Sequence, residues 1–151
     1  MLNQDYKEML SALSGEKVEY LFVGAYALAG HGLARATGDI DIFVKPSLEN
    51  SQKVYKALQI FGAPLSEIQP DTFSRPDVIF QMGVQPRRID VISSITGVSF
   101  QDAWDRRQVR RVEDLDLPVL SIDDLILNKT ATGRPKDLVD VEWLKKKKGP
   151  K

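Results

Sequence analysis

Apolar residues in the first third of the chain follow helical and strand spacing in turn. Residues 2–13 repeat apolar positions every three or four residues, which predicts a helix that stops at Gly15. Residues 17–24, KVEYLFVG, are β-branched and aromatic and predict a buried strand, and the alanine-rich residues 25–32 predict a short helix. Residues 39–45, DIDIFVK, predict a second strand that is closed by proline.

The rest of the chain continues to mix helices and strands. The elements predicted are a serine-capped helix (47–62), a loop (63–76), two strands (78–84 and 88–95), a short helix (99–107), a hairpin (108–120), a capped helix (121–132) and a last helix that begins near Arg134 with Leu138, Val141 and Leu144 inward. This mixture predicts an α/β or α+β fold, with a mixed β-sheet flanked by helices and helices at the C-terminal end.

Length and composition indicate one folded domain. We expect a single domain over residues 1–145 and a basic tail over residues 146–151, since 151 residues with 42% hydrophobic and 28% charged residues can form one core. The longest largely apolar stretch, YLFVGAYALAG, is shorter than the ~20 residues that span a bilayer. We therefore expect no membrane segment and a cytoplasmic location.

Charge and the rarest residue types exclude several kinds of site. Lysine plus arginine, 21, balance aspartate plus glutamate, 21, so no overall positive field attracts nucleic acid. The absence of cysteine excludes disulfides, thiol nucleophiles and zinc-thiolate sites. The single histidine, His31, excludes a multi-histidine metal site, and we expect it to pack or cap rather than to act as a general base.

Two aspartates stand on one face of the predicted strand 39–45. Asp39 and Asp41 are two residues apart, about 6.6 Å along a strand, while Ile40 and Ile42 face the other side. Two carboxylates that converge to about 5 Å repel by ~3 kcal/mol at an effective dielectric constant near 20. A divalent cation between them would relieve this repulsion, and Mg²⁺ is typically held by one or two carboxylates plus substrate phosphates.

The chain supplies its own comparison for this spacing. Asp114 and Asp116 are also two residues apart, but they stand beside a proline in the predicted hairpin, where we expect solvated turn acids. Asp39 and Asp41 differ in their setting, since they follow an apolar strand, a glycine turn and a short helix.

That setting resembles the signature of the DNA polymerase β nucleotidyltransferase superfamily. The matching residues are Val23-Gly24-Ala25 at the turn and Asp39-Ile40-Asp41-Ile42 on the next strand, although Ala25 departs from the usual glycine or serine. The superfamily takes a third carboxylate from a neighbouring strand, and Asp90 in RRIDVIS is the candidate. The resemblance implies a nucleotidyltransferase-like core.

A second segment, LILNKTATGRPKDLVDVEWL, resembles small bacterial nucleotidyltransferase-like proteins related to the AbiEii toxins. In that group a lysine on one helix is followed by an Arg-x-Lys-Asp cluster that opens the next. The corresponding residues here are Lys129, Arg134, Lys136 and Asp137, with Asp140 one turn further on.

Together these resemblances imply a nucleotidyltransferase that depends on Mg²⁺ or Mn²⁺ and uses an NTP. Asp39, Asp41 and Asp90 would hold the metal ions, Gly24 and Ala25 would lie against the triphosphate, and Arg35 and Lys129 would bind phosphate oxygens, because cations match phosphate charge. Arg134, Lys136 and Asp137 are either further site residues or a solvated helix start.

The acceptor implied is a hydroxyl of a protein or RNA, in a toxin-antitoxin or phage-defence context that would include a cognate partner protein. The basic stretch WDRRQVRR either contacts a nucleic-acid acceptor or is an exposed face. The alternative function is a non-catalytic module of the same fold that binds a nucleotide or a partner protein.

Overall fold

The computed structural model describes residues 4–33, 39–84, 87–112 and 115–149. In these ranges the chain forms α1 (Gln4–Gly15), β1 (Tyr20–Val23), α2 (Gly24–Gly30), β2 (Ile40–Val44), α3 (Leu48–Phe61), the short 3₁₀ turn η1 (Thr72–Ser74), β3 (Ile79–Met82), β4 (Ile89–Ile92), α4 (Phe100–Asp105), β5 (Gln108–Val112), β6 (Leu115–Val119), α5 (Ile122–Thr132) and α6 (Pro135–Lys148). The order follows the elements predicted from the sequence.

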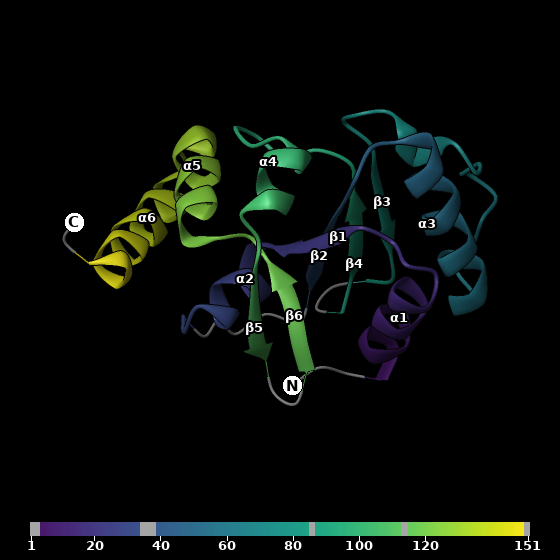
Figure 1. The fold of residues 1–151 in the computed structure, drawn as a ribbon, viewed down its shortest axis with the longest axis horizontal. Coiled ribbons are helices and arrows are strands. Elements are labelled where there is room, and N and C mark those ends of the chain that lie inside the picture. Colours follow the sequence, from purple (N-terminus) through teal and green to yellow (C-terminus); the bar gives the residue numbers. More distant parts are fainter. Residues whose placement is uncertain (1–3, 34–38, 85–86, 113–114, 150–151) are drawn as a thin grey trace.

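The strands of these ranges form one mixed sheet in the order β3-β4-β2-β1-β6-β5 (Figure 1). β2 is antiparallel to β1 and parallel to β4, while β6 is parallel to β1. The outer pairs β3–β4 and β5–β6 are antiparallel. The predicted mixed sheet with flanking helices is therefore confirmed.

The helices bury their apolar faces against the sheet and against one another. α1 packs beside α3 at one end of the molecule, and α5 packs beside α6 at the other (Figure 1). The central strands contribute side chains with almost no exposed area, including Phe22, Ile42 and Phe43. No helix in the described part of the chain is long and apolar enough to cross a membrane.

Three details of the C-terminal and loop regions differ from expectation. α6 continues through Lys148, so the basic tail expected from residue 146 begins as helix, because lysine favours helix and stabilises the negative C-terminal end of the helix dipole. Leu138 is 47% exposed, although Val141 and Leu144 are buried as predicted. In the predicted loop, η1 anchors the chain by burying Phe73 completely.

Asn50 ties the start of α3 to the central strands. Its side-chain oxygen accepts a hydrogen bond from the backbone N–H of Glu19 at 2.8 Å, and its amide nitrogen donates to the carbonyl oxygens of Glu19 and Lys45, both at 3.1 Å. Asn50 is buried. One side chain thus adds hydrogen bonds to backbone groups that precede β1 and follow β2, and it supplies the acceptor for the Glu19 N–H.

Asn50→Ala is expected to lower the free energy of unfolding by about 1–3 kcal/mol, because it removes three hydrogen bonds and takes away the acceptor of the Glu19 N–H. Equilibrium urea denaturation followed by circular dichroism measures the change. Gln52→Ala, an exposed position of the same helix, is the control and should change stability by less than about 0.5 kcal/mol. Equal stabilities of the two variants would contradict the role of Asn50.

Candidate active site

The turn from β1 into α2 brings the backbone close to Asp41. Gly24, the first residue of α2, has φ +67°, a conformation that side-chain-bearing residues rarely adopt. A Cβ atom at this position would lie 2.5 Å from Oδ2 of Asp41. A larger residue would strain the turn and displace the carboxylate, so glycine is required here on two grounds.

Three carboxylates gather where β2 and β4 begin. The parallel register pairs Asp41 of β2 with Asp90 of β4, and Ile40 with Ile89. Asp39 stands two residues before Asp41, immediately ahead of β2. Because side chains two residues apart share a face of a sheet, these acids project together while the isoleucines enter the core. We call Asp39, Asp41 and Asp90 the acid cluster.

Arg88 bridges two members of the acid cluster. Its Nε donates to Oδ1 of Asp90 at 2.9 Å, and its Nη2 donates to Oδ2 of Asp90 at 3.3 Å. The same Nη2 lies 3.9 Å from Oδ2 of Asp39, and the backbone N–H of Arg88 donates to Oδ1 of Asp39 at 3.0 Å. A forked guanidinium thus binds Asp90 in a bidentate pair and reaches Asp39 as well.

Asp41 experiences the residual negative charge of the cluster. Burial raises its pKa most, followed by repulsion from Asp90, a hydrogen bond with Asp90 and repulsion from Asp39. Arg88 lowers the pKa but does not offset these effects, so the pKa of Asp41 rises from 3.8 to about 6. The Asp41 carboxyl therefore keeps its proton to a higher pH than an isolated carboxyl would.

α1 closes one side of the acid cluster through Tyr6. The Tyr6 hydroxyl donates to the carbonyl oxygen of Arg88 at 3.3 Å, and its ring packs edge-on against Tyr26 of α2. Burial, then the neighbouring Tyr26 and Asp39, raises the pKa of Tyr6 to about 12. The hydroxyl consequently remains protonated and can continue to donate.

Sequence reasoning missed both Arg88 and Tyr6. Tyr6 reads as one more apolar position of the first helix, and nothing in its spacing marks it as a neighbour of the acids. Arg88 had a usable signal, since it stands two residues before Asp90 and so shares its face of the sheet.

The chemistry of the acid cluster fits a hard divalent cation, because carboxylate oxygens are the ligands that Mg²⁺ and Mn²⁺ take in proteins. The positions of the carboxylates, however, do not yet form a metal-coordination site. In the described ranges no group of three or more histidine, cysteine or acidic side chains is already placed to hold a metal ion. Among the described residues, Arg88 brings positive charge to the cluster.

A second set of charged residues joins α5 to α6. Nζ of Lys129 lies 3.0 Å from Oδ2 of Asp140 and 3.6 Å from Oδ1 of Asp137. Asp137 also accepts hydrogen bonds from Nε of Arg134 at 2.7 Å and from the Thr132 hydroxyl at 2.8 Å. The side chains of Asp137 and Asp140 are 1% and 3% exposed. Together, Lys129, Arg134, Asp137 and Asp140 form the interhelix cluster.

Asp137 is the centre of the interhelix cluster. The hydrogen bond from Arg134, and then those from the Thr132 hydroxyl and the Arg134 backbone together with the charge of Lys129, hold the pKa of Asp137 well below its usual range, against the effect of burial. Asp137 also accepts from the backbone N–H of Arg134 at 3.2 Å and so caps α6. Its carboxylate is therefore ionised at any physiological pH.

The structure separates the other predicted site residues. Lys136 is exposed on α6 and is not one of the four residues of the interhelix cluster. Ala25 is half-buried in the first turn of α2. Arg35 lies outside the described residues. His31 is buried and its Nε2 is 2.8 Å from the carbonyl oxygen of Leu120, which confirms the packed interpretation.

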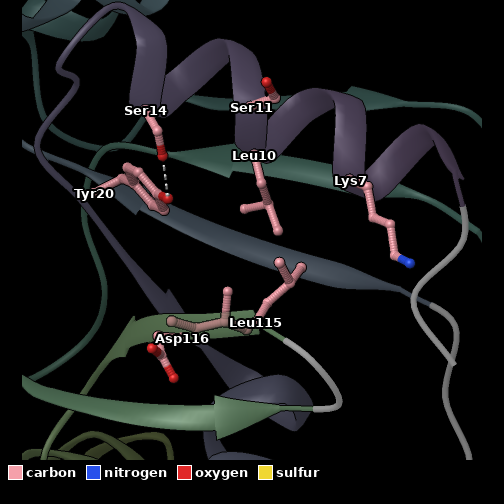
Figure 2. A pocket seen from close by; sticks show the side chains of 8 residues that line it. Lys7, Leu10, Ser11, Ser14, Tyr20, Leu115 and Asp116 are labelled. Atoms are coloured by element: carbon pink, nitrogen blue, oxygen red, sulfur yellow. Dashed lines mark hydrogen bonds between the residues drawn. The ribbon is translucent and has the colours of Figure 1, made fainter.

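A hollow of about 250 Å³ lies between α1 and β6, and no member of the acid cluster lines it (Figure 2). Its walls carry Lys7 and Asp116 together with the paired hydroxyls of Ser14 and Tyr20, 3.2 Å apart. Tyr20 opens β1, whereas Gly24 follows its end. The hollow is therefore a surface feature distinct from the acid cluster.

Comparison with known proteins agrees with the observed fold. The family model described as "Nucleotidyltransferase of unknown function (DUF6036)" matches residues 1–146. A crystal structure of a candidate nucleotidyltransferase from Thermotoga maritima superposes with a TM-score of 0.61 and 18% identity, over 97% of this chain and 94% of the other. At this identity the likeness establishes the fold. The search of curated proteins found no match.

Asp41→Asn is expected to stabilise the metal-free protein at pH 7.5. A carboxyl whose pKa is raised on folding contributes stability when protonated and loses it as pH rises from about 4 through about 6. The neutral amide avoids this loss, a gain of about 1–3 kcal/mol that shrinks towards pH 4. Urea denaturation in EDTA at both pH values measures it. Asp116→Asn, at an exposed carboxylate paired with Arg111, is the control. An equal gain in stability for Asp41→Asn at both pH values would contradict the raised pKa of Asp41.

Asp137→Ala is expected to cost about 3–5 kcal/mol at pH 7, because it removes one partner of a buried ion pair. Since the pKa of Asp137 is depressed on folding, its contribution is present above the unfolded value near 3.9 and is lost as pH falls below it. Thermal denaturation between pH 7 and pH 3 measures the difference. Asp123→Ala removes the exposed pair with Lys148 and should cost less than about 1 kcal/mol; a comparable loss at both positions would contradict the assignment.

Proposed function

Because the chain belongs to the DUF6036 family, nucleotidyltransferases of unknown function, we propose that it transfers a nucleoside monophosphate from an NTP to a hydroxyl of a protein or RNA acceptor. The observation that carries this proposal is the register of β2 and β4, which sets Asp41 beside Asp90 with Asp39 two residues away. Three carboxylates beside a glycine turn are suited to bring a divalent ion and a triphosphate together.

The reaction forms one bond and breaks one. The acceptor oxygen attacks the α-phosphorus, the bond from that phosphorus to the bridging β-oxygen breaks, and pyrophosphate leaves with the electron pair. The hydroxyl proton passes to a carboxylate of the acid cluster. Mg²⁺ or Mn²⁺, when bound, neutralises charge on the triphosphate and the leaving pyrophosphate.

Residues of the chain would position the substrate. Asp39, Asp41 and Asp90 would hold the ions, and Gly24 would let the backbone approach the phosphates because no Cβ intervenes. Ala25 would contribute only its backbone there. Lys129 is the proposed phosphate-binding cation, and its pairs with Asp137 and Asp140 would hold the ammonium in a defined place. Arg134 would support it through Asp137.

The resemblance to AbiEii-related proteins favours a toxin-antitoxin or phage-defence role with a cognate partner protein. The alternative remains a module that binds a nucleotide without turnover. The contacts of Arg88 with Asp39 and Asp90 favour that alternative, because a guanidinium that stayed bound there would exclude metal ions from the carboxylates. Nucleotide binding in Mg²⁺ without release of pyrophosphate would identify such a module.

The proposed transfer is tested with the four NTPs, each labelled at the α-phosphate, in Mg²⁺ with a bacterial extract and with total RNA. We expect label to appear on protein or RNA and pyrophosphate to be released. Asp41→Asn and Asp90→Asn should each lower the rate by at least about a hundredfold, because several kcal/mol of charge stabilisation are lost.

Asp116→Asn is the matched control, since Asp116 is an exposed aspartate outside the acid cluster. Its rate should stay within about twofold of wild type, as expected for an exposed ion pair. Transfer that survives both substitutions in the acid cluster would refute the site, and release of pyrophosphate by none of the NTPs would refute the enzyme.

A further inference from the structure

Arg88 and the acid cluster occupy one face of adjacent strands in register. Since Ile40 pairs with Ile89 and Asp41 with Asp90, the position before each strand sets Asp39 opposite Arg88. The face therefore presents three carboxylates and one guanidinium in two consecutive rows.

The backbone of Arg88 is fixed independently of its side chain. Its carbonyl oxygen accepts from the N–H of Ile40 at 3.0 Å and from the Tyr6 hydroxyl at 3.3 Å. Its N–H donates to Asp39 at 3.0 Å. The guanidinium, in contrast, contacts the carboxylates of Asp39 and Asp90. A movement of the side chain alone would therefore leave the strand in place.

The position of the guanidinium is the one that a metal ion would need. It contacts both oxygens of Asp90 and lies near Asp39, using the carboxylate oxygens that would otherwise be ligands. The Arg88 side chain is 28% exposed, so it has access to solvent when it leaves. The two cations would compete for the same oxygens.

We propose that Arg88 is the resident counterion of the acid cluster, and that its guanidinium leaves Asp90 and Asp39 when a divalent ion binds. This inference rests on the proposed function, because it takes the acid cluster to be the metal site. In this view Arg88 is a positioning residue. In the metal-free protein its guanidinium holds the like-charged carboxylates together, and the loss of its contacts weakens the net binding of the metal ion.

The competing explanation is that Arg88 shapes the ligands and stays in place. The two explanations predict opposite effects on metal affinity. If the guanidinium competes with the metal, removing it strengthens metal binding, since the ion no longer displaces charge-assisted hydrogen bonds. If it only shapes the ligands, removing it loosens the carboxylates and weakens metal binding.

The experiment measures Mn²⁺ binding without nucleotide, by electron paramagnetic resonance, to wild type, Arg88→Met and Arg87→Met. Arg87 is the adjacent exposed arginine, so its variant removes the same charge next to the site. We expect Arg88→Met to bind Mn²⁺ about tenfold more tightly than wild type, because the ion no longer displaces charge-assisted hydrogen bonds. Arg87→Met should stay within about threefold.

Thermal denaturation supplies a second readout. Arg88→Met should melt at a lower temperature than wild type in EDTA, because its carboxylates repel without a counterion, and Mn²⁺ should raise its melting temperature more than that of wild type. This pattern distinguishes a well-folded variant with a vacated cation position from a variant that is merely unfolded.

The outcomes separate this inference from the proposed function. Equal or weaker Mn²⁺ binding by folded Arg88→Met, with clear binding by wild type, overturns the counterion role and leaves the metal site standing. If Arg87→Met strengthens Mn²⁺ binding as much as Arg88→Met does, the effect comes from net charge alone, and the counterion role of Arg88 is also overturned. No Mn²⁺ binding by any of the three proteins overturns both the metal site and the inference.

Discussion

The candidate site depends on like-charged carboxylates held close together by the pairing of β2 with β4. The parallel ladder leaves Asp41 and Asp90 side by side, because each belongs to a strand whose alternate residues are locked into the core. The repulsion that results cannot be relieved by moving a strand without exposing Ile40, Ile42, Ile89 and Val91. Other features of the region respond to this constraint: the glycine that leaves room for Asp41, the arginine that bridges its neighbours and the raised pKa of Asp41.

The two charged clusters differ in how their carboxylates are paired with positive charges. In the interhelix cluster Lys129 and Arg134 form ion pairs with the nearly inaccessible carboxylates of Asp137 and Asp140. These ion pairs join α5 to α6. In the acid cluster, among the described residues, Arg88 contacts Asp90 and Asp39, and the pKa of Asp41 is nevertheless raised. The divalent ion proposed for this site would supply further positive charge there.

Membership of a nucleotidyltransferase family and the likeness to the Thermotoga maritima structure agree with this interpretation at the level of fold. At 18% identity the likeness establishes the fold and not the chemistry, which rests on the residues of this chain. Those residues favour metal and phosphate binding on physical grounds, since carboxylates attract divalent ions and a glycine turn admits a phosphate. The base of the NTP and the acceptor depend on surfaces that these clusters do not define.

Local pattern alone determined much of this protein. The spacing of apolar residues predicted the order of helices and strands, and period two predicted that Asp39 and Asp41 share a face, because both depend on neighbours in the chain. Only the tertiary structure decided that β2 lies parallel to β4, that Arg88 reaches Asp39 as well as Asp90, and that Tyr6 of a distant helix closes their flank. It also decided that Lys129 is held by two buried aspartates. Apart from the pair of Arg88 with Asp90, these contacts join residues of different elements, and packing of the whole chain selects them, so no periodicity along the chain encodes them.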